Sequence, residues 1–154
     1  MNKEGEVVPT IGVVTFRAEQ VLLVRHGTKA GHIQDTVGIP SGRIELDDNR
    51  QPKESPKEAS ARELREETGY EVDEVNLAEF EGNHFLADIP RSDGSIVKMS
   101  WNVFLASQIT GEMKEGDDET SPLWYPVNDI NDLNLLPNVA SVIINAQKFI
   151  NSQR

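Results

Sequence analysis

The amino-acid sequence predicts an α/β domain in which helices pack against a mixed β-sheet. Two observations indicate this fold class: short apolar runs of strand length recur between turn residues, and two other segments carry helix signals. The chain of 154 residues suits a single domain that spans residues 1–154. Hydrophobic residues make up 37% of the chain, which supplies a core and argues against disorder of the whole chain.

Strands are predicted from apolar runs and from alternation. Residues 11–16 and 21–24 are apolar runs, and the polar residues 17–20 between them predict a hairpin connection. Residues 97–105 carry apolar side chains at every second position, which predicts a strand with one buried face. A further short strand is predicted at residues 123–127.

The first helix is predicted to run from about residue 56 to residue 68. Ser55 is a favourable N-cap, Pro56 suits the first helical position, and Glu58 completes a capping box with Ser55. Gly69 suits the position just beyond the C-terminus, where a left-handed conformation is common.

A second helix is predicted near the C-terminus, where apolar side chains recur at helical spacing. The stripe consists of Val139, Val142, Ile143, Ala146, Phe149 and Ile150. Asn138 directly precedes this stripe and is expected to cap the helix with its side chain.

The composition excludes several classes of function. The formal net charge of −11 repels polyanions and so disfavours binding to nucleic acid. The chain has no cysteine, which excludes disulfides and zinc–thiolate sites. Its first six residues are polar, and apolar runs such as residues 21–24 are too short to span a bilayer. We therefore expect a cytoplasmic protein that contacts neither membrane nor nucleic acid.

Three glutamates on the first helix form a candidate metal site. Glu63, Glu66 and Glu67 are three and four residues apart, so the helix places them on one face near its C-terminal end. Their mutual repulsion and the helix dipole both disfavour this arrangement unless a divalent cation binds there. The alternative is a solvated surface on which Arg62 and Arg65 neutralise the glutamates.

The residues around this helix resemble the Nudix hydrolase family. The family signature is a glycine, five residues, a glutamate, seven residues, and then Arg-Glu-apolar-any-Glu-Glu-any-Gly-apolar. Residues 62–70 read Arg-Glu-Leu-Arg-Glu-Glu-Thr-Gly-Tyr and match the last block at every fixed position. Glu54 stands at the required distance before Arg62, and residues 38–45 resemble the loop half of the motif. The resemblance covers most of the domain and implies a Nudix-like α/β/α sandwich with a mixed β-sheet.

Two departures from the signature distinguish this chain. The family usually has Gly-Gly after the proline, whereas this chain has Ser41-Gly42. Gly42 also lies twelve residues before Glu54 instead of six, and the six extra residues fall within residues 46–53. We interpret them as an insertion in a surface loop, because lengthening a loop costs little free energy.

The resemblance also implies a metal site and a mechanism. Glu63, Glu66 and Glu67 would bind Mg²⁺, or Mn²⁺ in its place, together with the backbone carbonyl of Gly42. Arg62 would orient these carboxylates while water attacks a phosphorus of a diphosphate bridge. Either Glu63 or Glu66 would act as the base, and the sequence does not decide between them.

Other candidate metal ligands lie outside the motif. Many family members take a further acidic residue from a loop near the end of the sheet. The candidates here are Asp117, Asp118 and Glu119, which lie in a loop expected at residues 110–121, and Glu119 is the one selected. The alternative for each of them is a solvated loop charge.

Candidate substrate contacts are fewer. Arg25 and Arg43 are candidates for phosphate binding, with ordinary surface charge as the alternative. Asn138 resembles an asparagine with which some family members read an oxidised purine, although capping of the last helix is the preferred interpretation. Trp101 is expected to pack in the core and not to stack on a base.

The predicted function is Mg²⁺-dependent hydrolysis of the diphosphate linkage in a nucleoside diphosphate derivative. Motifs typical of NADH, ADP-ribose and dinucleoside polyphosphate hydrolases are not visible, which favours nucleoside triphosphates, including oxidised ones such as 8-oxo-dGTP. ADP-ribose-like compounds remain a second class. The alternative is a non-catalytic Nudix-like module that senses a nucleotide. Homodimers are common in the family, and no feature of the sequence decides the oligomeric state.

Overall fold

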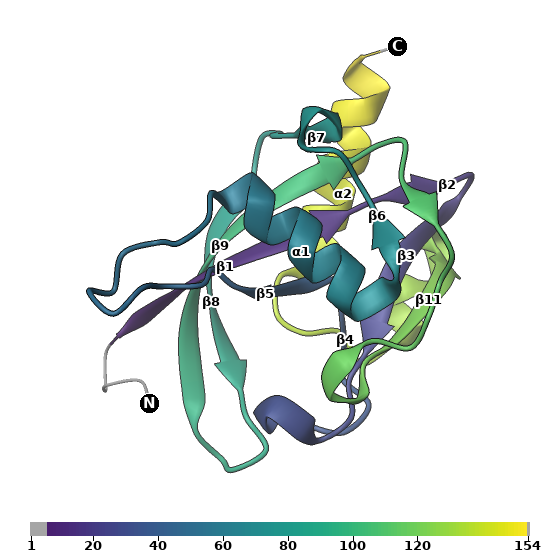
Figure 1. Cartoon of the computed structure of the whole chain (residues 1–154). Coiled ribbons are helices and arrows are strands. Elements are labelled where there is room, and N and C mark those ends of the chain that lie inside the picture. Colours follow the sequence, from purple (N-terminus) through teal and green to yellow (C-terminus); the bar gives the residue numbers. More distant parts are fainter. Residues whose placement is uncertain (1–5, 154) are drawn as a thin grey trace.

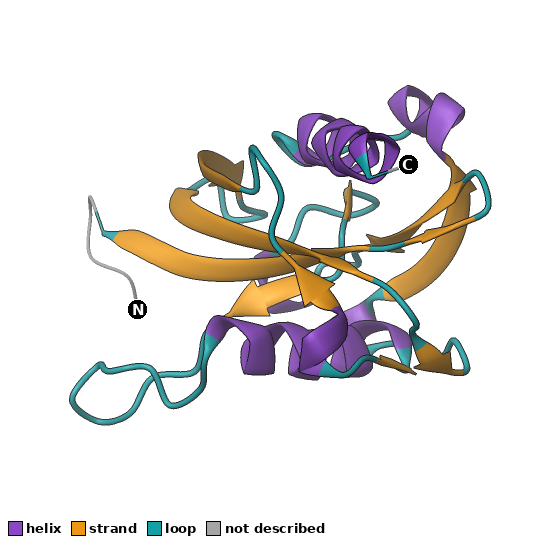
Figure 2. Ribbon diagram, turned by 90° about the horizontal axis from the view of Figure 1, so that it is seen from above, coloured by secondary structure: helices purple, strands orange, loops and turns teal. Residues whose placement is uncertain are grey.

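A computed structural model describes residues 6–153 of the chain. Two helices, α1 (Pro56–Thr68) and α2 (Val139–Ser152), lie on opposite sides of a central layer of strands, as Figures 1 and 2 show. The predicted α/β sandwich is therefore confirmed. None of the helices in the described part of the chain is long and apolar enough to cross a membrane.

The larger sheet is mixed, as predicted. Its order is β5-β1-β9-β7, and β8 also pairs with β9. The strands are β1 (Val7–Val14), β5 (Ser41–Arg43), β7 (Leu77–Ala78), β8 (His84–Pro90) and β9 (Ile96–Ala106). Strands β1 and β9 run parallel over eight paired positions, whereas all other pairs in this sheet are antiparallel.

A second, antiparallel sheet packs beside the first. Its order is β11-β3-β2, with β4 also paired to β3. The strands are β2 (Phe16–Arg17), β3 (Gln20–Arg25), β4 (Val37–Gly38) and β11 (Ser121–Pro126). The predicted strand at residues 123–127 thus corresponds to β11.

The predicted N-terminal hairpin is only partly correct. A tight turn does join β2 to β3, and Ala18 in that turn has a φ of 53°. Residues 11–14, however, belong to β1, which pairs with β5 and β9 in the other sheet. The break falls at the buried Thr15, whose hydroxyl donates to the carbonyl oxygen of Ala106 at 2.9 Å. The apolar run at residues 11–16 therefore contributes to a strand in each of the two sheets.

The alternation predicted for residues 97–105 is present in the first half of β9. Met99 and Trp101 are buried while Lys98 and Ser100 are exposed. The last four residues of β9 are all buried, because its second half has both faces covered. Side chains on one face join the main core that packs against α2, and the opposite face joins a smaller core at α1.

The segment expected as a loop at residues 110–121 contains two short regular pieces. Strand β10 (Thr110–Gly111) pairs with β6 (Tyr70–Glu71), directly after α1. The 3₁₀ turn η3 (Asp117–Glu119) follows. Pairing with β6 holds this acidic segment next to the C-terminal end of α1, which brings it close to the helix glutamates.

The remaining turns are also 3₁₀ segments. They are η1 (Lys29–Gly31), η2 (Glu74–Asn76) and η4 (Val127–Asp132). The tip of the β8–β9 hairpin contacts η1, where the amide of Ser92 donates to the carbonyl oxygen of Gly31 at 2.9 Å. This contact ties the long hairpin to the loop after β3.

Helix α2 buries the predicted apolar stripe, but its N-terminus differs from the prediction. Val139, Val142, Ile143 and Ala146 are buried. Asn138 occupies the N-cap position with a left-handed φ of 68°, and its side chain makes no capping hydrogen bond. That backbone conformation turns the side chain away from the first turn, so the capping prediction is wrong.

Candidate active site

Helix α1 begins and ends as its sequence predicts. Ser55 accepts a hydrogen bond from the amide of Glu58 at 3.1 Å, and the carboxylate of Glu58 accepts one from the amide of Ser55 at 3.0 Å. Gly69 adopts a φ of 85°, and its amide donates to the carbonyl oxygen of Arg65. Because both ends are fixed by capping, the orientation of every glutamate on the helix is set.

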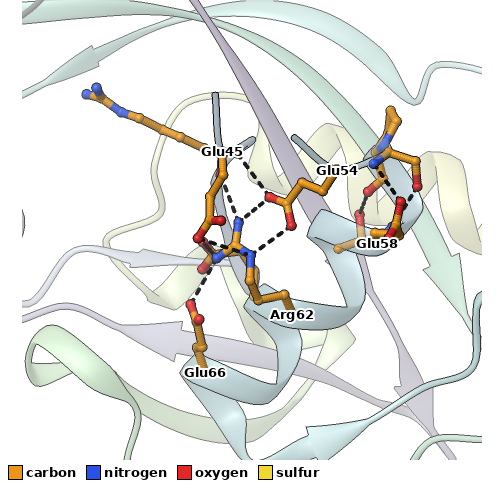
Figure 3. A network of polar contacts seen from close by, with 10 residues as sticks. Glu45, Glu54, Glu58, Arg62 and Glu66 are labelled. Carbon is orange, nitrogen blue, oxygen red and sulfur yellow. Dashed lines mark hydrogen bonds and ion pairs between the residues drawn. The ribbon is translucent and has the colours of Figure 1, made fainter. Parts of the chain in front are cut away.

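Arg62 lies at the centre of a polar network that joins α1 to the segment before it (Figure 3). Its Nε and Nη2 bind the two carboxylate oxygens of Glu54 at 3.0 and 2.7 Å. Its Nη2 also donates to the carbonyl oxygen of Arg43 at 3.1 Å, which connects the helix to β5. The hydrogen bonds from Arg62 hold the pKa of Glu54 below its ordinary value. Glu54, which stands at the signature's distance before Arg62, thus binds it in a bidentate ion pair.

The third guanidinium nitrogen of Arg62, Nη1, binds two of the predicted metal ligands. Its Nη1 donates to Glu63 at 2.8 Å and to Glu66 at 3.1 Å. Burial nevertheless raises the pKa of Glu63 to about 7, because the loss of hydration outweighs the attraction of Arg62. Glu63 is therefore a carboxyl group that gains and loses its proton near neutral pH.

Glu67 completes the acidic face from the last turn of α1. Its carboxylate accepts a hydrogen bond from the amide of Ser41 at 2.7 Å, which ties the helix to the loop half of the motif. Part of its surface opens into a cavity, yet desolvation raises its pKa well above the ordinary value. The backbone of Gly42 lies close to the side chain of Glu63: a Cβ added at Gly42 would lie 2.2 Å from the carboxyl carbon of Glu63. Only glycine leaves room for that carboxylate against β5.

The donor set fits a hard divalent cation. Oxygen ligands of this kind are those that Mg²⁺ binds in proteins. Two of the three carboxylates are desolvated to the point that their pKa values rise, so a nearby positive charge would stabilise their ionised forms. Within residues 6–153, no three acidic or histidine side chains already hold the geometry of a metal site. Arg62 binds two of the three carboxylates in this state.

A cavity of about 330 Å³ opens beside these carboxylates. Glu63 and Glu67 line it, and so do two arginines, Arg43 on β5 and Arg91 at the end of the β8–β9 hairpin. The guanidinium of Arg91 also donates to the carbonyl oxygen of Ala30 in η1. Burial, and then the charge of Arg43, lowers the pKa of Arg91. The cavity thus presents both carboxylates for a cation and guanidinium groups for phosphate oxygens.

The cavity also contains side chains that the sequence did not identify as part of a site. His26 and His32 stack with ring centroids 3.8 Å apart, and Trp101 lines the same cavity. Trp101 is buried and stacks on Phe85, as core packing predicts, but it also faces the site. The only signal for His26 was its position one residue beyond a buried strand. Strand pairing places Trp101 beside Thr10, which pairs in turn with Arg43.

The acidic loop contributes a different residue from the one predicted. Asp118, and not Glu119, lines the cavity. Both residues have positive φ values, 56° and 62°. The side chain of Glu119 lies over Gly27, where an added Cβ would be 2.3 Å from its Oε2. Two successive left-handed residues reverse the direction of the side chains, which sequence spacing could not reveal.

Two predicted substrate contacts also lie away from the cavity. Arg25 is exposed at the end of β3, whereas its neighbours Val24 and His26 are buried. Asn138 is exposed and donates from Nδ2 to the carbonyl oxygen of Leu86 at 3.2 Å. Of the three predicted substrate contacts, only Arg43 lines the cavity.

A comparison with known protein families identifies the family to which this chain belongs. The model of the NUDIX domain matches residues 7–145, which is most of the chain. The chain belongs to the NUDIX domain family. This family comprises pyrophosphohydrolases, so the predicted class of enzyme is confirmed at that level.

Solved structures of other Nudix domains share the fold at low sequence identity. A MutT protein from Methanosarcina mazei is 18% identical, with a TM-score of 0.67 and coverage of 99% of each chain. A MutT protein from Bacillus halodurans is 23% identical, with a TM-score of 0.64 and coverage of 91% of this chain and 82% of that one. The NUDIX domain of Shewanella oneidensis NrtR, solved with ADP ribose, is 17% identical. Its TM-score is 0.64, and the match covers 94% of this chain and 89% of that one.

Proposed function

We propose that this Nudix domain hydrolyses the diphosphate linkage of nucleoside diphosphate derivatives in a Mg²⁺-dependent reaction. The observation that carries the proposal is a cavity in which the desolvated carboxylates of Glu63 and Glu67 face the guanidinium groups of Arg43 and Arg91. Carboxylates suit a hard dication, and guanidinium groups suit phosphate oxygens. Nucleoside triphosphates, including oxidised ones such as 8-oxo-dGTP, are the proposed substrates. ADP-ribose-like compounds are the second class, since the similar NrtR domain was solved with ADP ribose.

The residues divide into those that hold the cation and those that hold the substrate. Glu63, Glu66 and Glu67 would hold Mg²⁺ together with the carbonyl of Gly42, and Asp118 takes the place predicted for Glu119 as the acidic residue of the loop. Bound Mg²⁺ would neutralise phosphate oxygens and make the attacking water more acidic.

Glu63 is the proposed base, and Glu66 is the weaker candidate. The carboxyl group of Glu63 lines the cavity, whereas Glu66 does not. With Mg²⁺ bound, the carboxylate of Glu63 would be ionised and would accept the proton of the attacking water. Arg62 would keep the carboxylate in position through its hydrogen bond of 2.8 Å. Arg43 and Arg91 would bind the phosphate oxygens on which negative charge accumulates.

The proposal is tested by product release from a panel of nucleotides, with and without Mg²⁺. The panel contains canonical and 8-oxo-nucleoside triphosphates, ADP-ribose, NADH and dinucleoside polyphosphates, with products separated by chromatography. We expect metal-dependent cleavage of one class, and we expect Glu63→Gln and Glu67→Gln to abolish it. Glu71→Gln, the same change at an exposed residue on β6, is the control and should retain activity. Tight nucleotide binding without any cleavage would support a sensing module instead.

A further inference from the structure

Two side chains that line the cavity of the candidate active site carry buried polar atoms without a hydrogen-bond partner. Among the described residues, the buried side-chain nitrogen and oxygen atoms that lack a hydrogen-bond partner are Nδ1 and Nε2 of His26 and Nε1 of Trp101. Both residues line the same cavity. The two side chains come from different sheets, since His26 follows β3 and Trp101 lies in β9.

The indole N–H of the other tryptophan, Trp124, has a hydrogen-bond partner, unlike that of Trp101. Trp124 on β11 donates its indole N–H to the hydroxyl of Tyr70 at 3.0 Å. Buried polar groups are normally paired in this way, because leaving a donor unpaired away from water is costly. The unpaired indole N–H of Trp101, a residue that lines the cavity, therefore suggests a partner that the cavity binds.

His26 can offer two complementary hydrogen bonds. Burial, together with the nearby His32 and Arg91, lowers the pKa of His26 to about 3, so the ring is neutral at physiological pH. A neutral imidazole has one N–H donor and one nitrogen acceptor. Its ring is held in place by stacking on His32 and by the backbone pair that His26 makes with Asp35 and Thr36.

The cavity also has apolar side chains that an aromatic ring can contact. Ile89, Met99 and Leu136 line the cavity along with the indole of Trp101. The Nε2 atom of His26 lies near Gly38, where an added Cβ would be 3.6 Å from it and 3.2 Å from Leu136. Apolar walls with a few fixed polar atoms are the usual design of a site for an aromatic ring.

We propose that Trp101 and His26 form a subsite for the nucleobase, in which the indole N–H donates to an acceptor on the ring and His26 bonds its edge. The inference rests on the proposed function, because it assigns the diphosphate to the end of the cavity with Glu63 and Glu67. It deepens that function by making the base, and not only the diphosphate, a determinant of the substrate. A substrate whose diphosphate is attached to a sugar without a base lacks the ring that this subsite would bind.

The first experiment measures binding without relying on catalysis. The chain has two tryptophans, so Trp124→Phe leaves Trp101 as the only indole fluorophore. Titration of this variant with ADP or GDP in the presence of EDTA should change the emission of Trp101. Titration with inorganic pyrophosphate should change it far less. Equal responses to nucleotides and pyrophosphate, or no response to any of them, would overturn the proposal.

The second experiment measures discrimination by the enzyme. Trp101→Phe keeps the aromatic ring but removes the N–H, and His26→Phe keeps the stacking surface but removes both nitrogen atoms. Each should raise KM for the preferred nucleotide by about tenfold relative to its effect on the base-free 5-phosphoribosyl 1-pyrophosphate. The matched controls are Trp124→Phe and His84→Phe, which alter residues outside the cavity.

The outcomes separate this proposal from the proposed function. If the wild-type chain cleaves nucleotides but Trp101→Phe and His26→Phe weaken both substrate types equally, the base subsite is wrong and the hydrolase is retained. If the wild-type chain cleaves nothing, the hydrolase proposal fails, and the fluorescence titration alone decides the subsite. If Trp101→Phe does not fold, His26→Phe and the titration of Trp124→Phe still give a result.

Discussion

Glu54 and Arg62 form a bidentate ion pair that joins the loop before α1 to the acidic face of that helix. The two contacts, at 2.7 and 3.0 Å, use both carboxylate oxygens of Glu54. The backbone amide of Glu45 also donates to Glu54 at 3.0 Å, so the loop itself holds the pair in place. The position of Glu63 consequently depends on a residue that lies outside the helix.

Replacing Arg62 by lysine should therefore impair turnover while the protein remains folded. Lysine retains the charge but cannot bind Glu54, Glu63 and Glu66 simultaneously through a planar fork. Changes to residues that orient metal ligands typically cost 10- to 100-fold, and we expect a fall in kcat of roughly that size. Steady-state kinetics at several Mg²⁺ concentrations measures it. Arg65→Lys, an exposed position on the same helix, is the control. Full activity in Arg62→Lys would show that the network does not position the site.

Gly42 offers a way to separate activity from stability. In Gly42→Ala the new Cβ would lie 2.2 Å from the carboxyl carbon of Glu63, so the flexible end of that side chain must swing away. The displacement costs little stability but misplaces a catalytic group, which can lower the rate about 100-fold. Gly94→Ala should instead lower stability and leave activity unchanged. Gly94 lies at a turn with a φ of 87°, which alanine adopts at a cost, and a Cβ added there would have nothing within 4 Å. Activity and thermal unfolding of both variants test the contrast, and a large loss of stability in Gly42→Ala would contradict it.

The raised pKa of Glu63 should appear in the stability of the metal-free protein. The unfolded carboxyl ionises near its ordinary value of 4.5, whereas the folded one retains its proton up to about 7. The folded state then binds more protons in this window, so the free energy of unfolding falls as the pH rises through it. A shift of this size corresponds to a contribution on the order of 3 kcal/mol.

The measurement is urea denaturation in EDTA across this pH range, with Glu63→Gln compared with the wild type. The comparison is necessary because His26 acts in the opposite direction: its lowered pKa makes stability rise with pH up to its ordinary value of 6.5. Glu63→Gln should gain stability relative to the wild type as the pH approaches 7. A constant difference between the two proteins would mean that Glu63 ionises normally.

The sequence was sufficient to predict α1 to the residue, because capping is a local property. Ser55 and Gly69 fix both ends through contacts with residues only a few positions away. The acidic face and the partnership of Glu54 with Arg62 followed from spacing within the motif. The fold class and the mixed sheet also followed from the strand pattern and the family resemblance.

Features that depend on distant parts of the chain could not be predicted in this way. Asp118, and not Glu119, lines the cavity in a turn where two successive residues are left-handed, and Arg25 is exposed at the end of β3. Arg91 reaches the cavity only because the β8–β9 hairpin folds against η1. The spacing of residues along the sequence does not indicate these contacts between distant parts of the chain.

The loop before Glu54, which we interpret as an insertion of six residues relative to the family signature, leads to a final prediction. Residues 47–52 are all exposed and form a loop that projects beyond the N-terminal end of α1 (Figure 1). The carboxylate of Asp47 accepts hydrogen bonds from the amides of Asn49 and Gln51, so the loop is ordered mainly by its own contacts. Its base is closed independently, since the amide of Lys53 donates to the carbonyl oxygen of Glu45 at 2.8 Å.

Deleting residues 47–52 would restore the usual family spacing between Gly42 and Glu54. We expect the shortened protein to fold and to keep its turnover and substrate preference, because neither the Arg62 network nor the cavity lining includes the deleted residues. The ion pair between Arg50 and Glu6 would be lost, which at an exposed position costs at most about 1 kcal/mol. Thermal unfolding and kcat/KM with the preferred nucleotide test both parts. A folded deletion variant with an altered substrate preference would contradict this prediction and would assign the loop to substrate recognition.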